Sequence, residues 1–297
     1  MRARLTVTLI ALFVALDVVL VALSFRHTAA VPPESPPQAA PGTPSDLAPE
    51  TVGSKVTRKA VSLQPGPVYL DLGADGRALW ASRGDCDAGQ APQVYSKADP
   101  ASRPHRRHVD GLTEVLGVRV SADGSMSLVG TADGCQVARW TSTDTGRTWS
   151  LSQASGAGWY LTPDPAQEAV LTPGGRHSTP CVPLNVSPVD ASVARLLCDD
   201  GTVEGTSDGG VTWVPLGRLD GAVSIDFATP GDGVALATQR GCRSAVMTTS
   251  DGGTTWRRTA CLEGTHPRAI SAQGQELMAL VGSRTRTSAD GGLTWTG

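Results

Sequence analysis

The sequence predicts an all-β fold built from many short strands joined by tight turns. Three observations lead there: 34 of 297 residues are Gly, only 18% are charged, and 7 Trp stand against 3 Tyr and 3 Phe. Average globular chains hold about 7% Gly and about 25% charged residues. This composition disfavours coiled coils, helix-rich enzymes and disorder over the whole length. The length allows one large domain or two small ones, with enough residues for a sizeable core.

The charge balance of the chain indicates which class of partner to expect. The formal net charge is −3 and the sequence pI is about 5.9. Proteins that neutralise nucleic-acid phosphates normally carry a clear basic excess. We therefore do not expect a nucleic-acid partner.

The first element is an apolar segment, residues 5–25, that follows Arg2 and Arg4 and is interrupted only by Asp17. It is long enough to span about 30 Å of hydrocarbon, and the positive residues before it predict a cytoplasmic N-terminus. We expect residues 1–4 to be cytoplasmic and residues 5–25 to be a transmembrane signal anchor that attaches the chain to the cell membrane. A cleaved secretory signal ending at residues 28–30 remains the alternative, and the protein would then be secreted.

A Pro-rich linker follows at residues 26–55. Seven Pro lie between Val31 and Glu50, among Ala, Ser and Gly. Such a segment is typical of an extended spacer that cannot build a core. The folded domain is therefore expected at residues 56–297, on the extracytoplasmic side of the membrane.

A motif of eight residues recurs four times in this domain. Each copy has a hydroxyl residue, an Asp two positions after it, and a Gly two positions after the Asp. A Thr and a Trp follow at the second and third positions after the Gly. An Asp that accepts hydrogen bonds from the turn and a Gly with positive φ suit a tight turn between antiparallel strands. The four sets are Ser142, Asp144, Gly146 and Trp149; Thr206, Asp208, Gly210 and Trp213; Thr249, Asp251, Gly253 and Trp256; and Ser288, Asp290, Gly292 and Trp295.

The repeated motif resembles the Asp box, the repeat of bacterial neuraminidases that occurs in sialidase-like β-propellers. The resemblance implies a hairpin turn between the third and fourth strands of a propeller blade, at the rim and away from a catalytic pocket. It therefore specifies a fold strongly and an activity hardly at all. It also admits a non-catalytic assembly role, as in the propeller factors that help to build photosystem II.

The spacing of the motif predicts the number of blades. The four Trp are separated by 64, 43 and 39 residues, and a blade of four strands takes about 40–45 residues. The longest gap holds one enlarged blade or two short ones, and residues 95–99 hold a degenerate copy of the motif. We expect six blades, with five or seven as alternatives. A strand at residues 56–63 is expected to pair with the last blade and close the ring.

Six Cys in a segment expected outside the cytoplasm predict three disulfides. In a hairpin that turns at residues 251–252, Cys242 and Cys261 would face each other, so this pair is expected first. Cys86 and Cys135 follow similar Gly-rich turns, which leaves Cys181 with Cys198. The spacing matches no zinc-site pattern, so no metal site is expected.

The remaining candidates for a binding role are one basic run and three Trp. Arg103, His105, Arg106, Arg107 and His108 form a possible binding patch for an anionic surface or partner, or a solvated rim loop in place of a lost repeat turn. Trp80, Trp140 and Trp159 lie outside the repeats. We expect them to pack between blades rather than to stack on a sugar ring.

No catalytic residue is assigned from the sequence. The resemblance to sialidases would imply an Arg-Ile-Pro motif and a late Tyr nucleophile, but the motif is missing and the Tyr are at 69, 95 and 160. We therefore expect a non-catalytic binding or assembly module for a protein or glycan ligand, without a cofactor. The alternative is a glycoside hydrolase. A hydrolase predicts converging carboxylates in an axial cleft, whereas the binding module predicts Arg, Trp and backbone groups without such a pair.

Overall fold

The computed structural model describes residues 67–153, 158–164 and 167–297, which form 22 β-strands in six antiparallel sheets. Each sheet is a blade whose strands follow one another in sequence order. The first blade contains β1 (Val68–Leu72), β2 (Ala78–Ser82), β3 (Val94–Lys97) and β4 (His105–Arg107). The second contains β5 (Glu114–Val120), β6 (Met126–Ala132), β7 (Gln136–Ser142) and β8 (Ser150–Gln153), with a short 3₁₀ turn, η1 (Asp133–Cys135), before β7.

The remaining four blades differ in their number of strands. The third is β9 (Tyr160–Leu161), β10 (Ala169–Thr172) and β11 (Gly175–Ser178). The fourth is β12 (Pro183–Pro188), β13 (Ala194–Cys198), β14 (Thr202–Thr206) and β15 (Val214–Arg218). The fifth is β16 (Ala222–Phe227), β17 (Gly233–Gln239), β18 (Cys242–Thr249) and β19 (Arg257–Cys261). The sixth is β20 (Pro267–Gln273), β21 (Glu276–Val281) and β22 (Arg284–Ser288).

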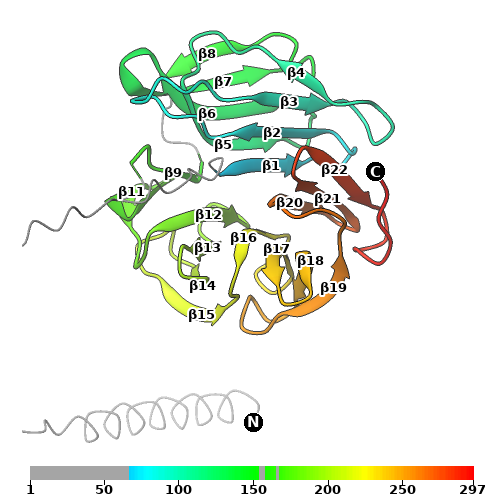
Figure 1. Ribbon diagram of the computed structural model, residues 1–297. Helices are drawn as coiled ribbons and strands as arrows, with labels where there is room; N and C mark the ends of the chain where they lie inside the picture. The colour runs from blue at the N-terminus through cyan, green and yellow to red at the C-terminus, as the bar shows by residue number, and fades with distance from the viewer. Residues whose placement is uncertain (1–66, 154–157, 165–166) are drawn as a thin grey trace, which may run out of the picture. The chain divides into compact units, whose positions relative to one another are not determined.

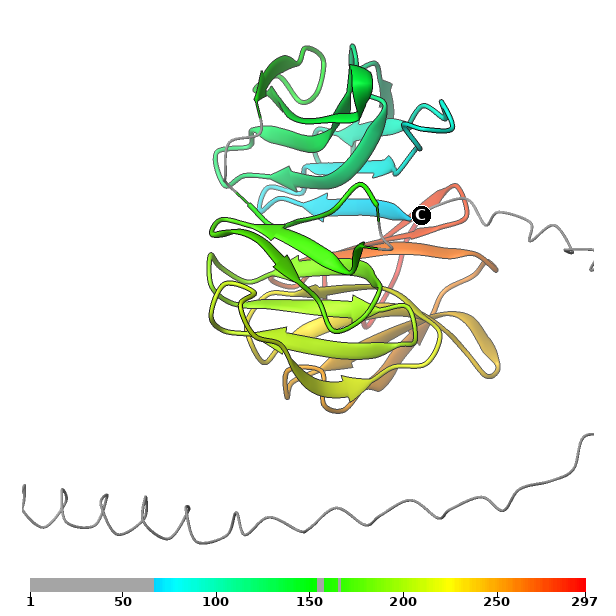
Figure 2. The ribbon, with the colours of Figure 1, turned by 90° about the vertical axis from the view of Figure 1, so that its left-hand side faces the viewer.

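The six blades form a closed ring around a central axis (Figure 1). The first strands of successive blades, β1, β5, β9, β12, β16 and β20, lie next to one another, and β20 lies beside β1. The side view shows the sheets stacked face to face from the cyan to the yellow blade (Figure 2). The domain is therefore an all-β propeller with six blades, which confirms the expected fold class and blade count.

The core lies between the blades. Val68 and Trp80 of the first blade pack with Ala269, Met278 and Leu280 of the sixth, so an apolar interface closes the ring. A second cluster joins blades four and five, and a third joins blades five and six. Sheets that pack on both faces need apolar residues on both, which explains the nearly continuous apolar runs in strands such as β13.

The long gap between Trp149 and Trp213 contains a complete short blade. The third blade has three strands among the described residues, and it lies between β8 and β12. The gap therefore corresponds to two blades rather than to one enlarged blade, and it resolves the alternative that the sequence left open.

The sixth blade is extended by the last residues of the chain. Thr296 forms an isolated bridge with Thr287 of β22, with two backbone hydrogen bonds of 2.9 Å. The strand expected at residues 56–63 lies outside the described residues. Pairing of that strand with β22 stays a prediction.

Three disulfides are present: Cys86–Cys135, Cys181–Cys198 and Cys242–Cys261. These are the expected pairs, but the register argument for the last one is wrong. Cys261 faces Ala245, not Cys242, because the turn is centred one residue later than expected, so that Thr248 faces Arg257, and a bulge between Val246 and Met247 adds a further shift of one residue. The disulfide instead joins the first residue of β18 to the last residue of β19, across a Cα–Cα distance of 5.7 Å.

The expected cytoplasmic segment at 1–4, the anchor at 5–25 and the linker at 26–55 lie outside the described residues. No helix in the described ranges is long and apolar enough to cross a membrane.

Candidate functional site

The four repeat turns share one hydrogen-bond pattern. The hydroxyl residue donates to Oδ1 of Asp and accepts from the backbone N–H of Gly, while the Thr near the end of the motif donates to Oδ2 of the same Asp. In the third turn, Thr249 Oγ1 lies 2.7 Å from Asp251 Oδ1, and Thr255 Oγ1 lies 2.6 Å from Asp251 Oδ2. Three of the turns directly connect the third and fourth strands of a blade, and the fourth follows β22.

These hydrogen bonds make the repeat Asp residues structural. Donors from Thr148, Thr212, Thr255 and Thr294 hold the pKa of the four carboxyls below the usual range. Three repeat Trp close the turn, since Trp149, Trp256 and Trp295 donate to the carbonyls of Gly146, Gly253 and Gly292. Trp213 makes no such bond and packs edge-on against Trp159. None of this arrangement offers a carboxylate for acid chemistry.

The degenerate motif at residues 95–99 does fall at the turn from β3 to β4. Lys97 occupies the hydroxyl position and donates from Nζ to the carbonyl of Pro100. Asp99 accepts from the backbone N–H groups of Ala101 and Ser102. The basic run therefore forms the outermost strand of the first blade, away from the axis.

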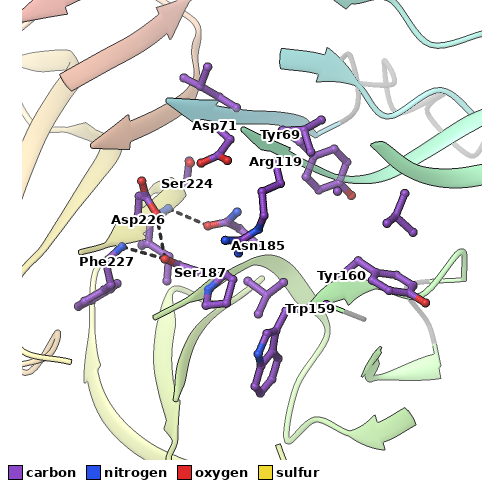
Figure 3. Close-up of a pocket in the computed structure, with 18 of the residues that line it drawn as sticks. Tyr69, Asp71, Arg119, Trp159, Tyr160, Asn185, Ser187, Ser224, Asp226 and Phe227 are labelled. Carbon is purple, nitrogen blue, oxygen red and sulfur yellow. Dashed lines mark hydrogen bonds between the residues drawn. The ribbon is translucent and has the colours of Figure 1, made fainter. Parts of the chain in front are cut away.

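The strongest candidate site is a pocket at the axis, with a volume of about 290 Å³. All six innermost strands contribute to it, and its polar side chains reach inward from different blades (Figure 3). Ligand sites of small molecules are typically concave and lined by a few convergent polar groups. The lining includes Asp71, Arg119, Trp159, Asn185, Asp226 and Gln273.

Asp226 ties three blades together at this pocket. Its Oδ1 accepts from Ser187 Oγ at 3.0 Å, and its Oδ2 accepts from Ser271 Oγ at 2.9 Å and from Ala272 N at 2.8 Å. Ser187 belongs to β12, and Ser271 and Ala272 belong to β20. Burial raises the pKa of Asp226, although these donors oppose the shift. Both carboxylate oxygens are thus engaged in joining blades four, five and six.

Asp71, on β1, lies near Asp226 and is held by fewer hydrogen bonds (Figure 3). Its Oδ2 accepts from the backbone N–H of Val120 on β5 at 2.6 Å. Burial, together with the negative charge of Asp226, raises the pKa of Asp71 to about 7, while Val120 and Arg119 oppose the shift. At neutral pH this carboxyl is divided between its acid and its ionised form, so it can donate or accept a proton.

Arg119, which lines the pocket together with Arg139, brings a positive charge to it. Its exposed side chain extends across the pocket toward Asn185, whose amide oxygen accepts from Ile225 N (Figure 3). No hydrogen bond or ion pair of Arg119 occurs within the described residues, so its planar donors can take a ligand. The arrangement places donors and acceptors side by side at the centre of the ring.

Trp159 is the one remaining Trp that reaches this pocket. It is half-buried, and its indole N–H donates to the carbonyl of Asp190 at 2.9 Å. Trp80 and Trp140 are buried in the blades, and Trp80 stacks on Tyr95. The expected packing role therefore holds for Trp80 and Trp140, whereas Trp159 both packs on Trp213 and lines the pocket.

A buried ion pair supports the pocket from the first blade. Arg83 donates from Nε to Glu114 Oε1 at 2.6 Å and from Nη2 to the carbonyls of Thr162 and Pro163. Tyr69, which lines the pocket, lies beside this pair, and burial raises its pKa to about 12. The network joins the first, second and third blades.

The axial carboxylates correct one expectation. A binding module was expected to lack a carboxylate pair at the axis, and the structure places Asp71 and Asp226 there together. Neither residue was predicted from the sequence, although each is the only charged residue in the first strand of its blade. That pattern is a usable signal, because an Asp in such a position needs a partner or a function.

The described residues hold no group of three or more His, Cys, Asp or Glu side chains that could bind a metal ion. A scan against protein-family models and a search of curated proteins give no match.

Solved structures with a similar fold were found. The chain is similar to YCF48 bound to D1 peptide, with 26% identity over 39% of this chain and 41% of that chain and a TM-score of 0.34. It is similar to the GH74 xyloglucanase from Xanthomonas campestris, with 16% identity over 77% of this chain and 37% of that chain and a TM-score of 0.35.

It is also similar to the PQQ-bound aldose sugar dehydrogenase from Streptomyces coelicolor, with 12% identity over 75% of this chain and 93% of that chain and a TM-score of 0.49. The chain spans less than half the length of YCF48 and of the xyloglucanase. All three TM-scores lie below 0.5, so these similarities carry no argument about activity.

Proposed function

We propose that this chain is a membrane-anchored extracytoplasmic propeller of the Asp-box type that binds a glycan in its axial pocket without cleaving it. The observation that carries the proposal is the composition of the pocket. Each sugar hydroxyl both donates and accepts a hydrogen bond, and Arg119, Gln273 and Asp71 offer both roles at one place. Trp159 adds apolar surface to the pocket wall, while its indole N–H is held by the carbonyl of Asp190.

The placement outside the cytoplasm is supported by the apolar segment at residues 5–25 and by three disulfides, which persist in oxidising compartments. Protease treatment of intact cells should release a fragment that contains the propeller domain. If the domain is digested only after the cells are broken open, this placement is wrong.

Glycoside hydrolysis is the second candidate, and the axial carboxylates favour it specifically. A hydrolase needs an acid with a raised pKa and a second carboxylate that acts as base or nucleophile. Asp71 fits the acid. Asp226 fits the second role poorly, because three hydrogen bonds occupy both of its oxygens. For this reason we place binding ahead of hydrolysis.

One experiment separates the two functions. The full-length chain in detergent is incubated with neutral oligosaccharides of two to six residues, and both binding and release of new reducing ends are measured. We expect saturable binding without product. Arg119→Ala should weaken binding about tenfold or more, since it removes a charged donor, while Arg240→Ala, at an exposed turn of the fifth blade, should leave binding unchanged.

Two kinds of result would contradict the proposed binding function. Product formation that disappears in Asp71→Asn would establish the hydrolase instead. A chain that binds none of these oligosaccharides, or binds them equally well after Arg119→Ala, would contradict a glycan site at the axis.

A further inference from the structure

We propose that the outer edge of the first blade binds an acidic, extended peptide that adds a strand to β4 and inserts an apolar side chain into the adjoining pocket. This blade-1 edge site consists of β4, the cationic side chains around it, and a pocket lined by Ala91, Pro92, Val94, Val109 and Leu112. It is separate from the axial pocket and does not depend on the function proposed there.

The first observation is a group of basic side chains, most of which have no acidic partner. Arg103, His105 and Arg106 are exposed, and they make no ion pair or side-chain hydrogen bond within the described residues. Burial and then the nearby charge of Arg147, in the first repeat turn, lower the pKa of Arg107, while Asp144 of the same turn opposes the shift. His108 Nε2 lies 2.8 Å from Asp110 Oδ1, and both side chains are almost fully exposed. The region is thus positive on a chain whose net charge is −3.

The second observation is an open strand edge. β4 is the last strand of its sheet, and its inner neighbour β3 pairs with it at three positions, Val94 with Arg107, Tyr95 with Arg106 and Ser96 with His105. No described strand pairs with the outer side of β4. Exposed edges accept an additional strand through main-chain hydrogen bonds, and alternate side chains then give specificity.

The third observation is an apolar pocket at the end of this edge, with a volume of about 400 Å³. Val94, Val109 and Leu112 form its buried apolar wall, and Arg106 and Arg107 border it. A partner that binds through charge alone would not use such a pocket, whereas a peptide strand added to β4 can place a side chain in it. Arg107 is fixed in place because its Nε donates to Ser96 Oγ at 2.7 Å.

The charge determines the kind of partner. Cations on an edge strand disfavour pairing with an identical edge, so a second copy of this chain is a poor occupant. Acidic side chains on a peptide would instead be attracted to the cations of this edge. An anionic polymer or lipid surface would use the charges but neither the strand edge nor the pocket, and we therefore favour a peptide. β4 has only three residues, so the side chains must contribute most of the affinity.

The test uses the full-length chain in detergent and an array of immobilised decapeptides. The peptides alternate Glu with neutral residues and carry one Leu, Ile or Phe at each position in turn. Two matched arrays replace Glu by Lys, or place Pro where backbone N–H groups would pair. We expect acidic peptides with one apolar residue to bind, and the Lys and Pro arrays to lose that binding.

Two variants test the location. Arg103→Glu combined with Arg106→Glu should weaken binding about tenfold or more, because like charges facing each other across an interface are strongly unfavourable. The control is Arg257→Glu, which makes the same kind of change on β19, the outermost strand of the fifth blade, and should change binding less than twofold.

Several results would overturn the proposal. These are an acidic array that binds no better than the Lys array, a Pro array that binds equally well, or a double variant that binds like Arg257→Glu. Complete displacement of the peptide by inorganic polyphosphate at an equal concentration of negative charge would indicate a general anion surface instead.

Discussion

Two aspartates of the fifth blade, Asp226 at the axis and Asp251 at the rim, have opposite electrostatic environments. Each accepts hydrogen bonds from hydroxyl and backbone donors. The pKa of Asp251 nevertheless falls below its usual range, while that of Asp226 rises. Asp251 is exposed, so its donors decide the shift, whereas Asp226 loses the solvation of water and its donors do not compensate fully.

The comparison shows that Asp stabilises this propeller in two different ways, depending on where it lies. At the rim, Asp organises one turn within one blade. At the axis, Asp226 joins strands of three blades that are separated by about 40 positions in sequence. Loss of a rim Asp should therefore be a local event, and loss of the axial Asp should loosen the ring.

The largest expected effect is that of Asp226→Ala. It removes the acceptor of Ser187, Ser271 and Ala272, and these groups are left partly unsatisfied, so the free energy of unfolding should fall by about 3 kcal/mol or more. Urea denaturation of the full-length chain measures this. Asp251→Ala is the matched change at the rim and should shift the midpoint by less than half as much. Equal shifts would contradict the comparison.

The next effect concerns pH and Asp71. Because its folded-state pKa of about 7 lies above the unfolded value of 3.8, the folded chain holds this proton more tightly than the unfolded chain. Its contribution to stability is therefore complete below about pH 4 and is lost as the pH rises to about 7. Because Asp71 is partly exposed at the pocket wall, solvent screens part of the shift, and we expect a loss of about 2 kcal/mol over this range.

Asp71→Asn should remove that pH dependence while keeping an acceptor for Val120 N. Denaturation midpoints of the two chains between pH 4 and pH 8 provide the measurement. The difference between the curves should be confined to this window. Asp226→Asn should in turn lower the pKa of Asp71, because a neighbouring negative charge is removed.

The smallest expected effect concerns a difference in backbone strain among the four rim turns. Thr145 in the first turn has φ of 63°, at the position where the other turns have Gly209, Gly252 and Gly291. A non-Gly residue in the left-handed region is strained, so Thr145→Gly should stabilise the chain by about 1 kcal/mol. The reverse change, Gly209→Thr, should destabilise it by a similar amount. A stabilising Gly209→Thr would show that the turns do not share one geometry.

The sequence was a good guide to the rim and a poor guide to the axis. Each repeat turn is a local unit, in which Asp251 and Thr255 are four residues apart and bond directly, so eight residues suffice to recognise it. The blade count followed from the spacing of such units. The register of Cys242 and Cys261 did not follow, because it depends on where the turn is centred and on a bulge in the strand pair beyond it.

The axial pocket is non-local. Asp71, Arg119, Asn185 and Asp226 come from four different blades, and only closure of the ring brings them together. No spacing along the chain encodes which inward residues meet. What the sequence does show is each polar residue within an apolar strand, as with Asp71 between Leu70 and Leu72. Polar residues in otherwise apolar inner strands are therefore candidates for the lining of an axial pocket, even before the fold is known.

The contacts of Arg83 have a consequence for how the ring opens. This single guanidinium bonds to Glu114 on the second blade and to carbonyls of Thr162 and Pro163 beyond β9, while the Cys86–Cys135 bond fastens the first blade to the second. Separating any one of these three blades would leave a buried charge without its partners. The first half of the ring should therefore exchange its amide hydrogens as one cooperative unit, and local opening should begin in the blades that Arg83 does not reach.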